Sequence, residues 1–303
     1  MWLAYAFVGP VLWAVSTHID KYLVDRYFRH SDTAVLMVFT ALTGILLLPV
    51  IAAFEPGVFQ PSLRNRAVMA VSGMLYMGGM LFYLRAIQQE EASVVAPLFQ
   101  ANTLFTFLLG WLFLGEALGW RQGAGMALVV AGALSLSIDA QFRLSAFKRT
   151  LVVLMLAATF AVALSGVLFK FFAVEDRFWA TAFWTFAGQG VFGLALLAVP
   201  GYGRQFVRLF RKSPGAVMGI NAANELINLG AGLSVRWASI LAPVALVTAV
   251  SSTFFVFLFG ILLTLFFPRL GREDLSPGNL VRKGIGAVLV MAGVVLIEWG
   301  RGG

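Results

Sequence analysis

Ten apolar runs, each about as long as one membrane crossing, constrain the fold of this chain more than any other feature. They lie at 2–22, 33–54, 66–86, 92–114, 121–138, 150–174, 179–199, 215–234, 238–267 and 282–299. A hydrocarbon core about 30 Å thick takes roughly 20 apolar residues per helix. Lipid offers backbone groups no partners, and the runs lack the alternation of barrel strands, so each run predicts an α-helix. We therefore expect an all-α integral membrane protein with ten transmembrane helices.

Composition supports the same class of protein. Apolar residues make up 60% of the 303 residues and charged residues 12%, with a mean hydropathy of +0.88, whereas soluble proteins are about 25% charged. The net charge of +8 comes mostly from Lys and Arg between the runs. That placement suits lipid headgroups, so we expect no nucleic-acid partner. The chain has no cysteine, which excludes disulfides and thiolate metal sites.

The chain is built from one five-helix unit used twice. Residues 92–98 (ASVVAPL) and 238–244 (ASILAPV) share four identities in register, and a glycine-rich segment beginning at 121 matches one beginning at 282. Because five is odd, the second unit enters the membrane from the opposite face. We expect two inverted repeats, at 1–141 and 142–303. Inverted repeats are typical of alternating-access transporters that hold substrate near the membrane midplane.

The stretch 83–137, with ASVVAPL, FLLGWLFLGEAL and GAGMALVVAGALSLS, resembles the EamA domain of the drug/metabolite transporter superfamily. The most distinctive feature is the Gly115-Glu116 step after the fourth run, where the second copy instead has LFFP at 265–268. The resemblance implies a ten-helix secondary transporter with a central cavity between the two halves. It implies no particular substrate, because the family spans amino acids, nucleotide derivatives, amines and drugs.

The eighth run carries the clearest candidate site. Asn221, Glu225 and Asn228 lie on one helix face, with Asn224 at its flank. An ionisable group inside a span raises the free energy of membrane insertion by at least about 2.5 kcal/mol, so its presence indicates a structural or functional role. One interpretation is hydrogen bonding that locks neighbouring helices together. The other, which Glu225 favours, is a substrate site or a proton- or cation-coupling site, because burial raises the pKa of an unpaired carboxyl.

Four further residues are candidates for the same site. Tyr76 and Tyr83 share a face of the third run, and if the halves are related by a twofold axis they face the acidic stripe, where aromatic rings favour amines. Ordinary apolar packing is the alternative, because the chain is rich in aromatic residues. Trp13 lies in the first run, and Gln100 follows the first Ala-Pro pair, where a proline kink suits a cavity wall. Lys170, at the repeat position of Lys21, is interpreted as reaching the headgroups.

Several kinds of chemistry find no support in the sequence. Spaced histidines for zinc, G-x-S-x-G and the P-loop are all missing, so we expect no enzyme activity, no cofactor and no metal. The glycines near 125 and 286 follow no strand, and they predict close helix packing rather than a nucleotide loop. Transport must then be driven by a gradient.

The leading hypothesis is a secondary transporter of small polar or cationic metabolites or drugs, exporter or importer, working by alternating access as a monomer. Its expected partners are a small-molecule substrate, protons as coupling ion, and lipids of a bacterial or archaeal inner membrane. A carrier or flippase of a lipid-linked headgroup and a non-transporting membrane scaffold remain alternatives. Loop charges place both termini outside the cell, whereas the family resemblance implies cytoplasmic termini, so the orientation stays open.

Overall fold

The chain folds into helices that follow the predicted runs closely. The computed structural model describes residues 2–23, 32–89, 95, 98–137, 149–175, 177–212, 215–250, 255, 258–259, 261–262 and 277–300. Its α-helices are α1 (Trp2–Leu23), α2 (Thr33–Phe54), α3 (Leu63–Gln89), α5 (Ala101–Leu114), α6 (Trp120–Ser137), α7 (Arg149–Glu175), α8 (Phe178–Ala198), α9 (Pro200–Lys212), α10 (Gly215–Leu241), α11 (Val244–Ala249) and α13 (Pro277–Trp299). No strand occurs in these residues, so the all-α prediction is confirmed.

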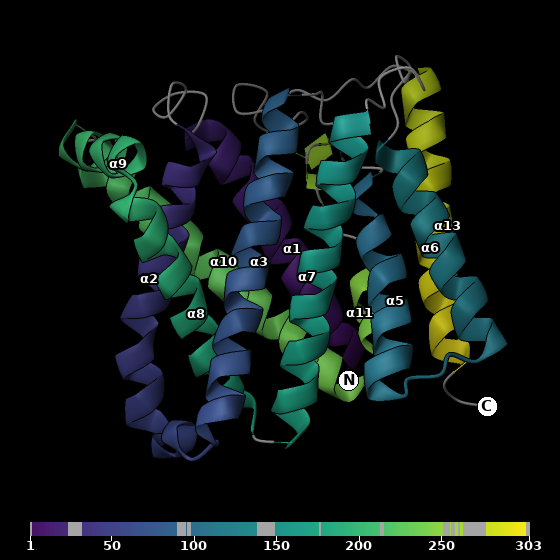
Figure 1. The fold of residues 1–303 in the computed structure, drawn as a ribbon. Helices are drawn as coiled ribbons and strands as arrows, with labels where there is room; N and C mark the ends of the chain where they lie inside the picture. The colour runs from purple at the N-terminus through teal and green to yellow at the C-terminus, as the bar shows by residue number, and fades with distance from the viewer. Residues whose placement is uncertain are drawn as a thin grey trace.

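The long helices stand side by side in a bundle, with α1 and α10 behind α3 and α7 (Figure 1). Among the described residues, four segments are long and apolar enough to cross a membrane by length and composition, and α1 and α5 contribute shorter apolar segments. The four are Ala34–Phe54, Leu63–Ala86, Arg149–Glu175 and Phe178–Ala198. Both termini lie at the same end of the bundle, and α9 lies across the other end. The part of the predicted ninth run after Val250 lies largely outside the described residues, and so does the LFFP segment at 265–268.

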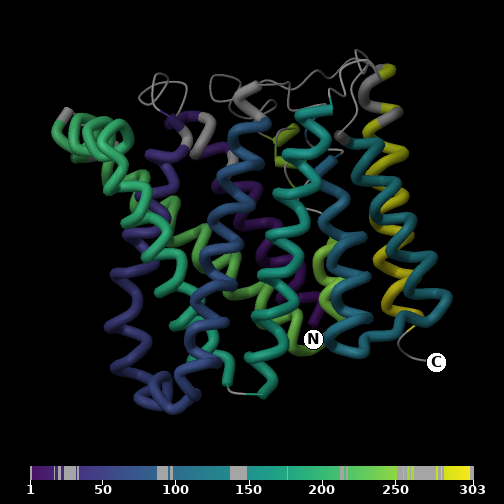
Figure 2. The backbone as a smooth tube through the Cα atoms, in the orientation of Figure 1, coloured from purple at the N-terminus to yellow at the C-terminus, as the bar shows by residue number. Residues whose placement is uncertain are grey.

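The two halves of the chain interleave rather than sit apart. Helix α1 packs against α10, and α7 packs against α3. The repeat aligns α1 with α7 and α3 with α10, so these two contacts are equivalent. Helix α2 packs against α8, and α6 packs against α13 (Figure 2). Each of these pairs joins one element of the first repeat to one of the second. Such exchange of equivalent contacts is the arrangement that a twofold axis between inverted repeats produces.

The contact between α6 and α13 is reciprocal at the level of single glycines. A Cβ added at Gly125 would lie 2.7 Å from the carbonyl oxygen of Gly293, and one added at Gly132 would lie 2.6 Å from that of Gly286. The repeat aligns Gly125 with Gly286 and Gly132 with Gly293, so the two close contacts are images of each other. Because the backbones approach this closely only without a side chain, the prediction of close helix packing is confirmed.

Helix α10 runs further than the eighth apolar run, whose predicted end at 234 is wrong. It continues to Leu241, and the break falls at the following Ala242-Pro243 step, after which α11 begins. Proline lacks the N–H that would continue the helix and clashes with the preceding turn. Arg236, which the sequence assigns to the connection after the run, therefore lies inside helix α10.

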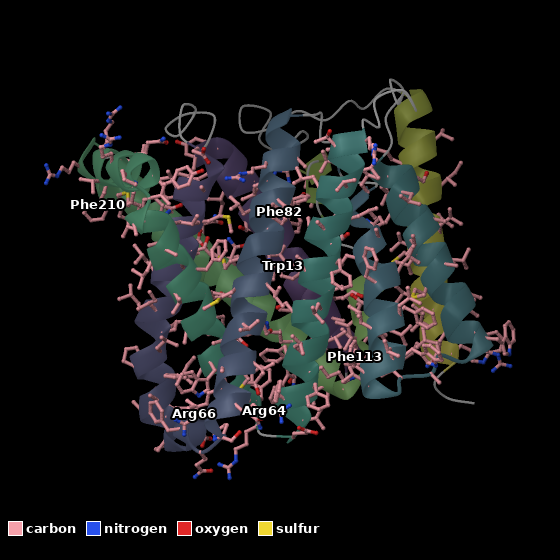
Figure 3. All side chains as sticks on the ribbon, in the orientation of Figure 1. Trp13, Arg64, Arg66, Phe82, Phe113 and Phe210 are labelled. Carbon is pink, nitrogen blue, oxygen red and sulfur yellow. The ribbon has the colours of Figure 1, made fainter. Side chains whose placement is uncertain are left out.

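Helix α9 was not predicted, because its apolar residues form a stripe rather than a run. Phe206 stacks on Phe39 of α2 with ring centroids 4.8 Å apart, and Leu209 packs near Leu23 of α1. The opposite face carries Arg204, Arg208 and Arg211, while Phe210 is exposed at the edge of the bundle (Figure 3). A basic amphipathic helix of this kind lies at a membrane surface.

Candidate functional site

The acidic stripe of α10 faces the interior of the bundle. The Glu225 side chain is 6% exposed, and its Oε1 accepts a hydrogen bond of 3.0 Å from the hydroxyl of Thr40 on α2. Asn221 and Asn224 are buried, and Asn228 is half-buried. The contact between Glu225 and Thr40 joins the second half of the chain to the first. A carboxyl group in this position can respond to relative movement of the halves.

The other predicted residues lie around this stripe at different distances. Tyr76 on α3 is near enough to interact electrostatically with both Glu225 and Arg236. Tyr83, two turns along, instead stacks on Phe99 with ring centroids 4.7 Å apart. Trp13 is half-buried at mid-height of the bundle (Figure 3). Gln100 is the residue before α5 and forms no side-chain capping bond.

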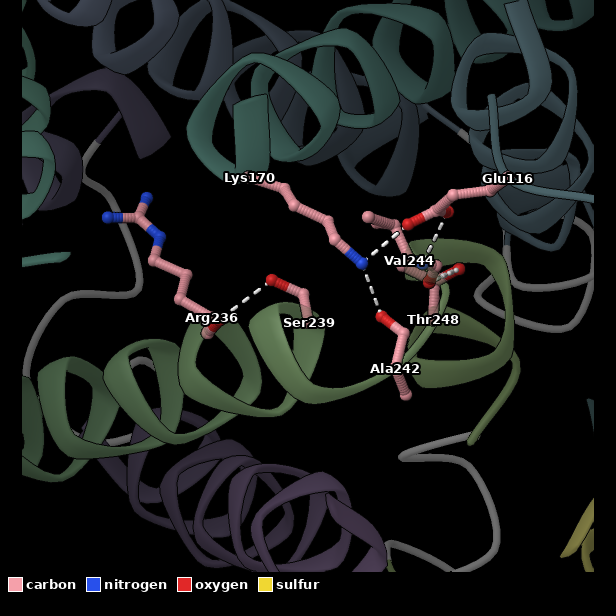
Figure 4. Close-up of polar contacts among 7 residues, drawn as sticks. All are labelled: Glu116, Lys170, Arg236, Ser239, Ala242, Val244 and Thr248. Atoms are coloured by element: carbon pink, nitrogen blue, oxygen red, sulfur yellow. Dashed lines mark hydrogen bonds and ion pairs between the residues drawn. The ribbon is translucent and has the colours of Figure 1, made fainter. Parts of the chain in front are cut away.

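A second polar cluster lies where α5, α7 and α10 end near one another (Figure 4). Lys170 Nζ of α7 lies 2.5 Å from Glu116 Oε1 and donates a hydrogen bond of 2.6 Å to the carbonyl oxygen of Ala242. Glu116 Oε2 accepts a hydrogen bond of 2.9 Å from the backbone N–H of Val244. Both charged side chains are mostly buried, at 13% and 12% exposure. The interpretation that Lys170 reaches the headgroups is therefore wrong.

The Pro243 break explains why these groups meet. Proline ends the regular helical bonding at this step, and the N–H of Leu246 bonds the carbonyl of Pro243 instead of that of Ala242. Lys170 supplies a donor to the carbonyl of Ala242. Glu116 places a negative charge on the first N–H of α11, where a helix favours an anion. Gly115 makes this possible by ending α5 in a left-handed conformation with φ of 66°, which favours glycine. The Gly115-Glu116 step of the first half thus stabilises the break between α10 and α11 in the second half.

Arg236 is a further charged group in the bundle, and it was missed from the sequence. Its guanidinium lies 4.6 Å from the ring centroid of Phe169 on α7 and 5.5 Å from that of Phe186 on α8. Its Nη1 atom is buried and makes no hydrogen bond, and no described carboxylate lies within ion-pair distance. Aromatic faces attract the cation but offer its N–H groups no oxygen acceptor. The one sequence signal was Pro243, which marks the true end of the helix.

A metal site finds no support in the part of the chain that the structure describes. No group of three or more His, Asp or Glu side chains gathers there. His18 lies half-buried on α1.

The first half of the chain matches a known family. Residues 1–138 match the EamA-like transporter family. A segment of 143 residues is 34% identical to an uncharacterized transporter in the cobO 3' region of a Sinorhizobium species. The aligned segment covers 45% of this chain and 96% of that protein. The second half is not part of the family match.

Two further relatives agree with this match. The chain is 27% identical over 133 residues to the pseudopaline exporter CntI of Pseudomonas aeruginosa, covering 44% of this chain and 46% of the exporter. It is 33% identical over 79 residues to the probable 4-amino-4-deoxy-L-arabinose-phosphoundecaprenol flippase subunit ArnE of Sodalis glossinidius, covering 25% of this chain and 70% of that subunit. The match to the exporter thus spans less than half of its length.

The fold itself has a solved counterpart. A structure described as "Crystal structure of protein" superposes with a TM-score of 0.69 over 98% of this chain and 96% of the other, at 16% identity. The structural similarity shows the fold of the chain, while the sequence matches show the family to which it is related. Together with the helices of membrane-crossing length, they identify the protein as a membrane transporter, and the chain belongs to the EamA-like transporter family.

Proposed function

We propose that this protein is a gradient-driven carrier of small polar or cationic molecules that works by alternating access. Two five-helix units, 1–141 and 142–303, rock against each other around a midplane site. Glu225 is the proton- or cation-responsive group, and Asn221, Asn224 and Asn228 orient the substrate. The membrane is the inner membrane of a bacterium, as the bacterial relatives suggest.

The observation that carries this proposal is the position of Glu225. Its carboxyl lies inside a spanning helix at 6% exposure, and its hydrogen bond to Thr40 crosses from one half of the chain to the other. A charge buried at this depth is costly in a purely structural role. In a carrier the same cost makes the group sensitive to a proton or cation that arrives from either side.

The Glu116–Lys170 cluster supports the same mechanism. It lies at the end of the bundle that holds both termini, and it joins the end of α5 to the α10–α11 break of the other half. In alternating access one end of the pathway is closed while the other is open. The ion pair between Glu116 and Lys170 is a contact that closes this end and separates when it opens.

The test is proton-coupled transport by the purified protein in liposomes. Amines, amino acids and sugar phosphates are added in turn, and proton movement is followed with a pH-sensitive dye trapped inside. We expect at least one compound to move protons through the unaltered protein. Glu225→Gln, which keeps the shape of the side chain and its contact with Thr40, is expected to abolish that movement.

The matched control is Glu55→Gln. Glu55 lies in the connection after α2, and its ion pair with Arg177 at 3.4 Å is partly exposed, so its loss changes little. Both variants must retain the melting temperature of the unaltered protein. Full coupled transport with an unchanged pH profile in Glu225→Gln would remove the role assigned to this residue.

A flippase of a lipid-linked headgroup is the second candidate. It is favoured by the 33% identity to the probable flippase subunit ArnE over 79 residues. A flippase would move a fluorescent headgroup-labelled lipid between leaflets of the same liposomes. In that case the water-soluble compounds would leave the dye signal unchanged.

A further inference from the structure

Glu225 and Arg236 lie on the same face of α10. Eleven residues separate them, which is close to three full helical turns, so their Cα atoms lie roughly 16 Å apart along one line. Tyr76 of α3 is within electrostatic reach of both charges. The tyrosine is therefore near both the buried acid and the buried base.

The Arg236 side chain extends toward the N-terminal part of α10 and away from Ala242 (Figure 4). Side chains of a helix lean toward its N-terminus, which in α10 is the end farther from Leu241 and closer to Glu225. The rings that flank the guanidinium, Phe169 and Phe186, lie within the bundle. A residue that reached for headgroups would extend the other way.

The face between the two charges has open space beside the helix backbone. Gly232 lies between Glu225 and Arg236 on the same face, and a Cβ added there would meet no atom within 4 Å. Gly166 of α7, one turn before Lys170, is equally open. By contrast, a Cβ added at Gly9 on α1 would meet Val235 of α10 at 2.3 Å. Helix α10 is thus closely packed toward α1 and open on its charged face.

We infer that Arg236 binds the carboxylate of a zwitterionic substrate whose ammonium group is bound at Glu225. This inference rests on the proposed carrier function and names its substrate class. One guanidinium matches the single charge of a carboxylate. A zwitterion also leaves the occupied site electrically neutral, which a low-dielectric membrane interior favours.

The absence of cysteine from the chain makes this site directly testable without transport. Gly232→Cys introduces a single thiol between the two charges. We expect it to react with small, water-soluble methanethiosulfonates of either charge. Adding Arg236→Gln is expected to slow the anionic reagent relative to the cationic one by about fivefold or more, and adding Glu225→Gln is expected to do the opposite.

Gly219→Cys is the matched control, because Gly219 lies on the exposed first turns of the same helix and has equally open surroundings. Its reaction rates are expected to be independent of Arg236. A thiol at 232 that reacts with neither reagent in folded protein would show a sealed, dry contact and overturn the inference. Equal rates with and without Arg236 would overturn it as well.

The substrate class is tested by protection of the same thiol. The probes are 6-aminohexanoate, hexylamine and hexanoate, which share a chain and differ in their charged ends. We expect 6-aminohexanoate to slow the reaction of Gly232→Cys most, and Arg236→Gln to reduce its effect to that of hexylamine. Equal effects of the three probes, including no effect of any, would refute the zwitterion assignment. Since no step requires transport, these results are separate from the liposome test of the carrier function.

Discussion

Glu116 is held by two contacts that depend on each other. One of its oxygens faces the ammonium of Lys170, and the other accepts the N–H of Val244 at the start of α11. Lys170 in turn satisfies the carbonyl of Ala242, on the other side of Pro243. Removal of either charge therefore leaves the other one buried beside a helix end that has lost part of its cap.

We predict that Lys170→Met destabilises the protein more than removal of both charges does. Breaking a buried ion pair from one side costs about 3–5 kcal/mol, whereas neutral replacement of both partners costs much less. The double variant Glu116→Gln with Lys170→Met should recover at least half of the loss, because the amide oxygen of the new side chain can still accept from the N–H of Val244. Thermal unfolding in detergent measures both. A double variant that is less stable than either single one would mean that the charges do not form a pair.

At the scale of elements, the α6–α13 contact depends on glycine at four equivalent positions. Gly293 approaches Gly125 so closely that a Cβ on Gly293 would lie 2.6 Å from the carbonyl oxygen of Gly125. Backbone atoms cannot move aside as a flexible side chain can. The two helices, one from each repeat, are thus held together by close approach of their backbones.

We predict that Gly125→Val and Gly293→Val each weaken this contact by about 1–3 kcal/mol, the usual cost of overpacking. Gly123→Val and Gly284→Val are matched controls on the same two helices, because a Cβ at either glycine meets nothing within 4 Å. Thermal unfolding should separate the two pairs of variants, with only the first pair losing stability. Equal losses in all four would attribute the effect to helix propensity instead of packing.

The elements were predictable from the sequence wherever hydropathy alone decides them. Long apolar runs gave α2, α7 and α8 almost to the residue. The end of α10 was not predictable in this way, because an apolar count treats Arg236 as the start of a connection, whereas a helix tolerates a charge that faces the interior. Helix α9 was missed for the related reason that its apolar residues recur three and four apart.

The candidate site was predictable only in part for a similar reason. Glu225 stood out because it interrupts an apolar run, and its helix face followed from spacing. The partners did not follow, because Thr40, Tyr76 and Phe169 come from other helices and depend on how those helices pack. Lys170 was misinterpreted since its partner Glu116 lies far away in sequence.

At the scale of the whole molecule, the two ends of the bundle differ in their basic groups. Arg64 and Arg66 lie at the end that holds the termini, whereas the arginines of α9 lie at the opposite end (Figure 3). Loop charge favours the α9 end as the cytoplasmic one, and the family resemblance favours the other. The fold requires only that the two ends face different compartments.

We predict that Gln60→Cys and Val207→Cys label from opposite sides of the membrane. Gln60 lies exposed between α2 and α3, and Val207 lies exposed on α9 at the other end. Each variant carries one thiol in a chain without cysteine, and neither substitution alters a loop charge. A membrane-impermeant maleimide should label one variant in intact cells and the other only after permeabilisation, and the variant that labels first assigns the side of the termini. Labelling of both variants in intact cells would contradict a bundle that crosses the membrane along its long helices.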